Sequence, residues 1–306
     1  MIEISYRPMV EADLASTALV RRSAIAWLER SEGREPDMVP IPPPPLIHRH
    51  ILRTQPAGSW VGEINGLVMG YAQALVRGDV WYLSQLFVLP EVHGHDLGRG
   101  VLERALAYGD ERGARVRAVI ASSSPVAQAL YMRAGMMTTG VGYRISGPVD
   151  ALLALPAPQA TQKRVVDCSG WQDRIAALDR EVWGAELRDE HALFLHGGGT
   201  LAEETGSFAL TQDGELLGYG YVSDDGWIGG VSAREPELQL PLLRMAGEWL
   251  AGRGVERANL FCISHNATVL GALLPAWWRI DAVSYFMTSG PFVQTDRYVP
   301  SGGLLL

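Results

Sequence analysis

One stretch of the sequence combines the features needed to hold an anion: Phe87 to Leu106, which reads FVLPEVHGHDLGRGVLERAL. An apolar strand runs into Pro90, which cannot donate a hydrogen bond to a neighbouring strand, so strand pairing is expected to fail beyond it. Glycines and histidines follow, and an amphipathic helix then begins near Gly98. Because the first amides of a helix are unpaired and lie at the positive end of its dipole, this layout suits a phosphate. Asp96 lies within it, where a second negative charge would oppose an anion.

A tyrosine with a possible chemical role follows downstream. The segment SPVAQALYMRAGM, which begins at Ser124, places Tyr131 on a predicted helix four residues before Gly135. A phenol can donate a proton to a leaving group, although an aromatic side chain on a helix can equally serve to pack a core. The residues around Tyr131 in the sequence are therefore needed to distinguish the two roles.

Composition limits the class of protein. A chain of 306 residues, 47% hydrophobic and 20% charged, predicts about two globular domains. The net charge of −8 disfavours nucleic acid as a partner and favours cationic small molecules. Lys163 is the only lysine, which excludes a P-loop. Cys168 and Cys262 are predicted to be buried thiols rather than a disulfide or zinc ligands.

The chain shows no membrane or targeting signal. The N-terminus has neither a basic segment nor an apolar core of the secretory type, and no run of 18 apolar residues occurs. A cytoplasmic protein without membrane contact, and without a metal site, is therefore expected.

The pattern of residues 2–147 predicts the element order β-α-α-β-β-β-α-β-α-β. Asn65-Gly66 marks the first hairpin turn of a three-stranded meander. The helix after the glycine-rich loop is expected to run from about Gly98 to Arg112.

The same order repeats in the second half of the chain. Asp213-Gly214 corresponds to Asn65-Gly66, and Arg253-Gly254 precedes His265 by the interval that separates Arg112-Gly113 from Ser124. Residues 148–163 are rich in alanine and proline, as in a semi-rigid linker. Two domains, 1–147 and 164–306, joined by this linker, are therefore predicted.

These motifs resemble those of the GCN5-related N-acetyltransferase (GNAT) family. Its loop, Gln/Arg-x-x-Gly-x-Gly/Ala after Val-x-Pro, corresponds to His93 through Gly98 after Val88-Leu89-Pro90. A later family signature, Asn-x-x-Ala-x-x-Leu-Tyr-x-x-x-Gly-Phe, is matched by Ser124, Ala127, Leu130, Tyr131, Gly135 and Met136. The resemblance covers residues 2–147.

The resemblance implies an α/β (α+β) fold of two tandem GNAT-like domains, each a mixed, mostly antiparallel central sheet flanked by helices. It further implies an acyltransferase that uses acetyl-CoA as co-substrate and acetylates a primary amine of a small molecule by direct attack, as a monomer or homodimer. Two other readings stay open at this point: a non-catalytic acyl-CoA binding or sensing protein, and an interaction scaffold in which Asp96 has abolished CoA binding.

By the same resemblance, Tyr131 is the general acid. The strand before Val-x-Pro lacks the carboxylate that the family often places there, so Ser84 is a candidate for a water-mediated proton relay, with Glu63, Asp79, His48 and His50 as alternatives. Asp96 is expected to cap the following helix in the empty protein and to turn outward when CoA binds. The expected cofactor-binding residues are Phe87, Val88, Leu89, His93, Gly94, His95, Asp96, Leu97, Gly98, Arg99, Ser124 and Ala127.

The second repeat departs from the family pattern. In GGVSAREPELQLPLL no glycine follows Gly230, and Glu235 and Glu237 occupy the phosphate position. Leu273 or Ala272 stands where the tyrosine is expected. The second domain is therefore predicted to be a degenerate copy that supports the first or shapes its acceptor pocket, rather than a second active site.

Overall fold

The computed structural model describes residues 3–36, 46–195 and 204–303. The chain forms two compact units. Unit 1 consists of Met1–Val119 and Ser124–Met136, and unit 2 of Ile120–Ser123 and Met137–Leu306.

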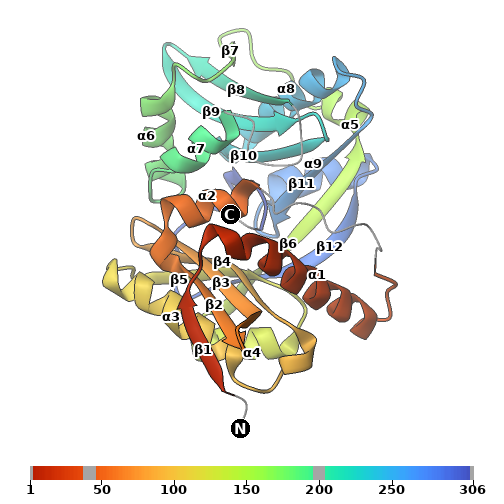
Figure 1. The fold of residues 1–306 in the computed structure, drawn as a ribbon. Coiled ribbons are helices and arrows are strands. Elements are labelled where there is room, and N and C mark those ends of the chain that lie inside the picture. The colour runs from red at the N-terminus through yellow and green to blue at the C-terminus, as the bar shows by residue number, and fades with distance from the viewer. Residues whose placement is uncertain (1–2, 37–45, 196–203, 304–306) are drawn as a thin grey trace. The chain divides into compact units, whose positions relative to one another are not determined.

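Unit 1 follows the predicted element order (Figure 1). Its helices and strands are β1 (Ile4–Pro8), α1 (Leu14–Ser31), α2 (Leu46–Thr54), β2 (Ser59–Ile64), β3 (Leu67–Arg77), β4 (Val80–Val88), α3 (Leu97–Glu111), β5 (Val116–Ala121, whose last two residues belong to unit 2) and α4 (Pro125–Arg133).

The sheet of unit 1 has the order β1-β2-β3-β4-β5. Its pairs are antiparallel except for β4 and β5, which run parallel. The predicted turn at Asn65-Gly66 is confirmed, with φ values of 52° and 75°. Both residues of the turn adopt positive φ because such turns match the twist of the strands they join.

Side chains alternate across this sheet and so direct different helices to its two faces. Tyr71 of β3 packs with Val61 and with Leu14 of α1 in one buried cluster. On the other face, a Cβ at Gly62 or Gly70 would collide with Leu97 of α3. Glycine at these two positions therefore lets the start of α3 lie directly on the sheet.

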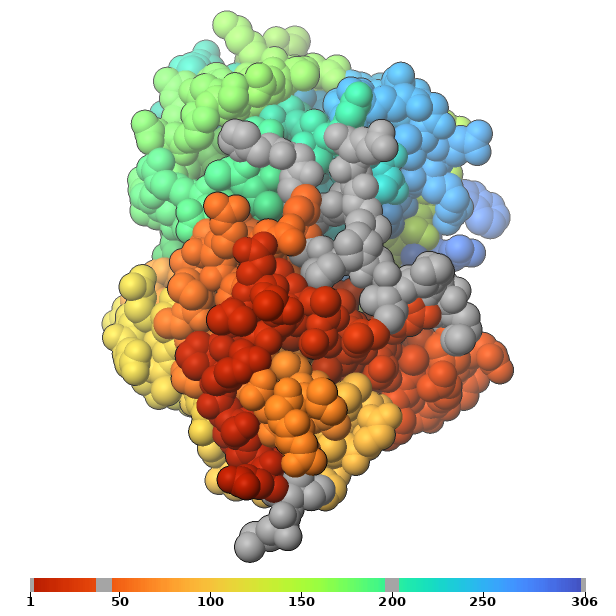
Figure 2. Space-filling view, in the orientation of Figure 1, coloured from red at the N-terminus to blue at the C-terminus, as the bar shows by residue number. Residues whose placement is uncertain are grey.

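The N-terminal segment remains at the surface of unit 1, where β1 is the edge strand of the sheet (Figure 2, red). Several large apolar side chains of α1 are partly exposed, among them Leu19, Ile25 and Trp27. Only the inward stripe of α1, which includes Leu14 and Val20, is buried.

Unit 2 repeats the order of unit 1 after an additional strand and short helix. Its helices and strands are β6 (Met137–Pro148), α5 (Val149–Leu153), β7 (Lys163–Val166), α6 (Gln172–Val182), α7 (Arg188–Leu195), β8 (Thr205–Gln212), β9 (Glu215–Ser223), β10 (Trp227–Ala233), α8 (Gln239–Ala251), β11 (Arg257–Ile263), α9 (Ala267–Leu273), β12 (Arg279–Thr288) and β13 (Tyr298–Val299).

The main sheet of unit 2 has the order β12-β6-β11-β10-β9-β8-β7, with β13 paired to β10. The strand β6, expected as the last strand of the first domain, pairs with β11 and β12. Within the expected linker, α5 buries Val149 and Leu152 in the core of unit 2. The compact units thus divide the chain at Met136, and the domain limits at residues 147 and 164 stay a prediction.

Both cysteines are buried free thiols, as predicted. None of the helices in the described part of the chain is long and apolar enough to cross a membrane.

Candidate active site

Strand β4 has one edge that is only partly paired. Along its full length it pairs with β3, from Val80 to Val88. Its pairing with β5 runs only from Val80 to Leu83. Within the described chain, Gln85–Val88 therefore have β3 as their single strand partner. Such an edge can accept an extended molecule that carries amide groups.

A β-bulge lies at the point where the pairing with β5 stops. In the β3–β4 register Gln73 faces Gln85 and Ala74 faces Leu83, so Ser84 is the extra residue. Bulges bend a strand and increase its twist. The bulge thus accounts for the end of the parallel pairing at Leu83.

The loop after β4 is compact. Leu89 N donates to Met69 O at 2.8 Å, and a 3-10 turn over Pro90–Val92 follows. His93 Nε2 lies 3.3 Å from Val88 O, so this ring folds back onto the strand end. Gly94 has φ +82°, a backbone conformation that favours glycine.

Asp96 occupies the N-cap position of α3, but its side chain makes no capping hydrogen bond within the described chain. The expectation that the Asp96 carboxylate caps the helix is therefore wrong. The reason is the backbone: Asp96 has φ 59°, whereas an N-cap residue that bonds the helix amides is usually extended. The first amides of α3 consequently carry no bond from this carboxylate.

The start of α3 lies against the end of β4. A Cβ on Gly98 would stand 3.2 Å from Val88 Cγ2, so a larger residue would push the helix from the strand. Leu97 is buried beneath it, and Arg99 points outward to an ion pair with Glu103 at 2.7 Å. The structure thus brings the unpaired strand edge and the amides of Leu97, Gly98 and Arg99 into one region of unit 1.

Tyr131 lies on α4 and is buried, with 5% of its surface exposed. Ser124 caps this helix by accepting a hydrogen bond from Ala127 N at 3.4 Å, and Gly135 ends it with φ +87°. Burial raises the pKa of Tyr131 above its ordinary value of 10. The phenol therefore keeps its proton at neutral pH, as a general acid requires.

Residues 23–136 match the family described as Acetyltransferase (GNAT) family. Among solved structures, a putative acetyltransferase from Pyrococcus horikoshii has a TM-score of 0.72 at 15% identity, with 96% of this chain and 92% of that chain covered. A tandem GNAT protein from the clavulanic acid biosynthesis pathway has a TM-score of 0.60 at 19% identity, with coverages of 94% and 99%.

The family match thus covers part of the first repeat, and over nearly its whole length this chain shares the fold of these structures. A GCN5-related N-acetyltransferase from Sphaerobacter thermophilus is similar over the same extent, with a TM-score of 0.60 at 18% identity and coverages of 96% and 98%. A search of curated proteins finds no match.

Most of the alternative bases in unit 1 are committed to other contacts or buried. Glu63 accepts hydrogen bonds from Arg7 at 3.0 and 2.7 Å, and exposed Asp79 pairs with Arg115. His48 is fully buried, and both of its ring nitrogens lack a hydrogen-bond partner among the described residues. Burial first, and the charge of Arg21 second, lower the pKa of His48 to about 3.

A buried chain of polar side chains, not expected from the sequence, crosses the α1–α2 face of the sheet of unit 1. Tyr71 OH donates to Gln85 Oε1 at 2.7 Å, and Gln85 Nε2 donates to Gln73 Oε1 at 3.0 Å. Gln73 Nε2 then donates to His48 O at 3.1 Å and to Ser59 Oγ at 3.3 Å. The signal that could have revealed it is the presence of two glutamines in otherwise apolar strands. Ser84, also buried, directly precedes Gln85 in β4.

The corresponding places in unit 2 are filled by the chain itself. β10 pairs with β11 at Trp227 and Ile228 only, and Val231 and Ser232 pair with β13. At the start of α8, Gln239 Nε2 donates to Pro236 O at 3.1 Å and to Asp296 O at 2.6 Å.

The tyrosine of the first repeat also has no counterpart in the second. Leu273 is fully buried, and Ala272 is partly buried, at the position that corresponds to Tyr131. Unit 2 thus lacks both the open strand edge and the phenol.

No metal-binding cluster supports the site. Over residues 3–36, 46–195 and 204–303, no group of three or more His, Cys, Asp or Glu side chains is arranged to hold a metal ion.

Proposed function

We propose that unit 1 transfers an acetyl group from acetyl-CoA to a primary amine of a small molecule. The observation that carries this proposal is the half-open edge of β4 at Gln85–Val88, which lies beside the first amides of α3. A pantetheine arm presents amides at the spacing of a peptide and can pair with such an edge, while its pyrophosphate needs a helix N-terminus. Unit 1 offers both features in one place.

The loop residues have distinct roles in this proposal. The amides from Gly94 to Arg99 bind the pyrophosphate, with His93 and His95 flanking it. The backbone of Phe87, Val88 and Leu89 pairs with the pantetheine arm, and Ser124 and Ala127 hold the helix that carries Tyr131.

The reaction follows from the groups around the thioester. The amine nitrogen attacks the thioester carbonyl, and a backbone N–H on the unpaired edge of β4 stabilises the oxyanion that forms. As the carbon–sulfur bond breaks, Tyr131 donates its proton to the leaving thiolate. The proton lost by the amine passes through water to Ser84 and on to solvent. A site built in this way needs neither a metal nor a covalent enzyme intermediate.

The acidic character of the chain supports a cationic amine as the acceptor. A net charge of −8 attracts cations over long range, and this attraction weakens as salt is added. Polyamines and aminoglycosides belong to this class, and amino acids and peptide N-termini serve as comparison substrates in an acceptor panel.

The test is the Tyr131→Phe variant, assayed by thiol release over this panel. Loss of a general acid lowers kcat by about 10²- to 10⁴-fold, while the Kd for acetyl-CoA stays the same. Tyr108→Phe is the matched control, because Tyr108 is a buried tyrosine of the same unit whose hydroxyl donates to Gln55 at 2.9 Å. Full activity of Tyr131→Phe would remove the acid assignment and leave the reaction class intact.

A second function, acyl-CoA binding or sensing without catalysis, is favoured by one observation. The carboxylates of Glu63 and Asp79 are both engaged by arginines, so neither is available as a strong base without breaking an ion pair. A thermal shift with acetyl-CoA together with an absence of thiol release for every amine would establish this function instead. If acetyl-CoA produced no thermal shift at all, neither function would hold.

A further inference from the structure

The helix α1 of unit 1 runs beside the strand that carries the proposed acyl-transfer site. It contacts β3, β4 and the turn at Pro90–Val92. Near the end of α1, Trp27 meets His93 of the loop after β4 edge-on, with ring centroids 4.9 Å apart. The second half of α1 therefore lies next to the half-open edge of β4 and can border the space where an acceptor amine must approach.

Arg21 lies on the same face of α1 as the buried residues of this helix. Helical spacing places five residues on this face: Leu14, Thr17, Ala18, Arg21 and Ile25. The first three are between 1% and 8% exposed. Arg21 is half-buried, and 38% of the surface of Ile25 is exposed. The face of α1 that packs on the sheet is thus open to solvent from Arg21 onward.

The charge of Arg21 acts on buried groups of the neighbouring elements. Burial first, and Arg21 second, lower the pKa of His48 on α2. Burial raises the pKa of Tyr71 on β3, and the charge of Arg21 opposes that rise. Both side chains are fully buried on the α1–α2 face of the sheet. The guanidinium of Arg21 therefore lies near the buried polar chain that ends on Gln85 of β4.

Arg21 has no counter-charge in the described part of the chain, where it makes neither a hydrogen bond nor an ion pair. The polar chain beneath it consists of amides and hydroxyls, which are neutral. Two carboxylates at the start of α1 are paired with other arginines, Glu11 with Arg49 at 2.8 Å and Asp13 with Arg7 at 2.7 Å. A half-buried charge without a counter-charge is costly, and a bound anion would remove that cost.

Unit 2 provides its own anion in the comparable pair of helices. Asp179 of α6 lies 2.7 Å from the ring of His191 on α7. In unit 1, α1 instead brings the charge of Arg21 to the buried His48 of α2. Beside the buried histidine, unit 1 thus carries a cation and unit 2 an anion. A ligand's negative charge is therefore favoured in unit 1.

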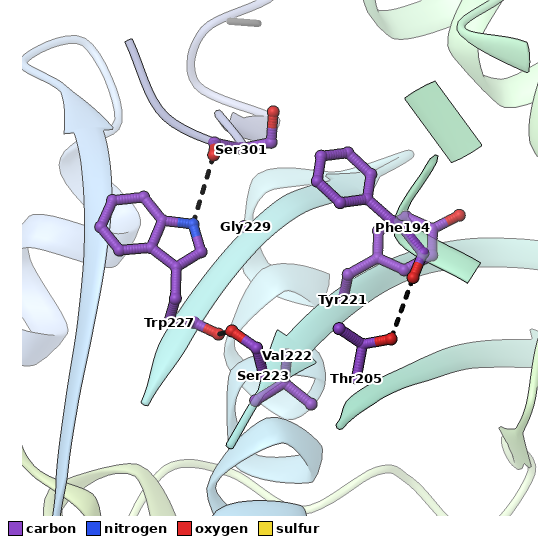
Figure 3. Close-up of a pocket in the computed structure, with 8 residues that line it drawn as sticks. All are labelled: Phe194, Thr205, Tyr221, Val222, Ser223, Trp227, Gly229 and Ser301. Carbon is purple, nitrogen blue, oxygen red and sulfur yellow. Dashed lines mark hydrogen bonds between the residues drawn. The ribbon is translucent and has the colours of Figure 1, made fainter. Parts of the chain in front are cut away.

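A small pocket of unit 2 does not offer an alternative site for the acceptor (Figure 3). Tyr221 in its wall is buried, and the pocket has room for about one water molecule. Thr205 Oγ1 donates to Phe194 O at 3.0 Å, and Trp227 Nε1 donates to Ser301 O at 3.2 Å. These donors are consequently already bonded to the protein.

We propose that Arg21 binds a carboxylate of the acceptor, so that unit 1 acetylates an amine that also carries a carboxylate, as amino acids do. The planar guanidinium can donate two parallel hydrogen bonds, which match the two oxygens of a carboxylate. This inference rests on the proposed function and narrows its acceptor class. A basic amino acid also has the second positive charge that the acidic chain attracts. Arg21 is thus a specificity-determining residue.

The test measures thiol release from acetyl-CoA by the full chain with pairs of acceptors that differ in the carboxylate. The pairs are glycine and glycinamide, and lysine and lysinamide. In Arg21→Gln, kcat/KM for each acid should fall by about tenfold or more, because the hydrogen bonds to a charged group are lost. The matching amide should lose about twofold at most. Arg21→Lys keeps the charge without the planar fork and should lose about threefold for the acids.

Arg22→Gln is the matched control. Arg22 is also half-buried on α1 and without an ion pair among the described residues, but its charge does not act on His48 or Tyr71. Its ratio of kcat/KM between acid and amide should equal that of the unaltered chain. Thermal unfolding of each variant confirms that the fold is kept, and Arg21→Lys provides the test should Arg21→Gln fail to fold.

The possible results separate this inference from the proposed reaction. Equal losses for acid and amide in Arg21→Gln would overturn the role of Arg21. A weaker Kd for acetyl-CoA in Arg21→Gln would also overturn it, because Arg21 would then bind the co-substrate. Transfer to cadaverine but to no acid of the panel would overturn the inference and leave the proposed function intact. If no amine caused thiol release, the proposed function would fail, and this inference with it.

Discussion

The two units use the same strand edge in opposite ways. In unit 1, β4 is paired with β5 as far as Leu83 and leaves Gln85–Val88 with one strand partner within the described chain. In unit 2, β10 is paired with β11 as far as Ile228, and the next part of its edge is covered by β13. The part of the edge that β5 leaves uncovered in unit 1 is thus partly covered in unit 2 by another strand of the same unit.

The buried histidines of the second helices show a similar contrast. His48 of α2 has no hydrogen-bond partner for its ring among the described residues, whereas His191 of α7 bonds Asp179 and Tyr221. The polar strand side chains near His48 are neutral amides, those of Gln73 and Gln85. His191 instead bonds the carboxylate of Asp179, which lies on α6. The second helices of the two units therefore carry buried histidines in different electrostatic surroundings.

The largest effect is expected from removal of β13. Truncation after Asp296 deletes Tyr298 and Val299, which are 3% and 0% exposed, together with the bond from Ala233 N to Arg297 O. Loss of two buried side chains costs unit 2 about 3–6 kcal/mol of unfolding free energy. Urea unfolding, with and without acetyl-CoA, separates the units, because the ligand stabilises only the unit that binds it.

Truncation after Pro300 is the control for this experiment, because it retains β13. Its unfolding free energy should lie well above that of the shorter chain. Were the two truncations equally stable, the strand would not be what completes unit 2. A shift of both unfolding transitions by acetyl-CoA would likewise contradict the contrast between the two strand edges.

The second-largest expected effect is a loss of stability of unit 1 at low pH, caused by His48. Burial lowers the pKa of His48 to about 3, whereas a histidine in an unfolded chain titrates near 6.5. Between these values only the unfolded state binds the proton, so the stability of unit 1 is complete above about pH 6.5 and falls as the pH is lowered. The expected loss is about 1.4 kcal/mol per pH unit down to about pH 3, measured by urea unfolding at a series of pH values.

His48→Leu should remove this dependence, since the unfolded variant has no proton to gain at that position. His95→Gln serves as the control because His95 is exposed, and it should keep the slope of the unaltered chain. An unchanged slope in His48→Leu would show that His48 does not remain neutral in the folded protein.

The comparison also shows what could be predicted from the sequence. The element order, the turn at Asn65-Gly66 and the helix after the loop follow from local residue patterns, and the structure confirms them. The pairing of β6 with β11 and β12 could not be predicted, because a strand pattern does not reveal which edge the strand will join. The same reason applies to β13, which has only two residues.

For the candidate site, the sequence shows the loop spacing from Pro90 to Gly98 and the position of Tyr131. It does not show which groups surround each side chain of the site. The hydrogen bonds among Tyr71, Gln85 and Gln73 form beside the β-bulge between β3 and β4, and no turn residue in the sequence indicates that bulge. The cap expected at Asp96 fails because residue type favours capping, whereas the loop imposes a left-handed backbone there.

The smallest effect is expected at Asp96, the residue where unit 1 departs from the GNAT loop. Its carboxylate is exposed at the start of α3, so repulsion with a bound pyrophosphate amounts to about 1 kcal/mol. Asp96→Gly should therefore bind acetyl-CoA about fivefold more tightly, and glycine also suits the φ of 59°.

Asp96→Asn separates the two contributions, since it removes the charge and still tolerates the left-handed backbone. Calorimetric titration at low and high salt measures both, and the gain should shrink as salt screens the charge. If Asp96→Gly left the Kd unchanged at low salt, Asp96 would not oppose CoA binding, and the loop of unit 1 would hold its anion as well as the glycine-bearing loops of its family.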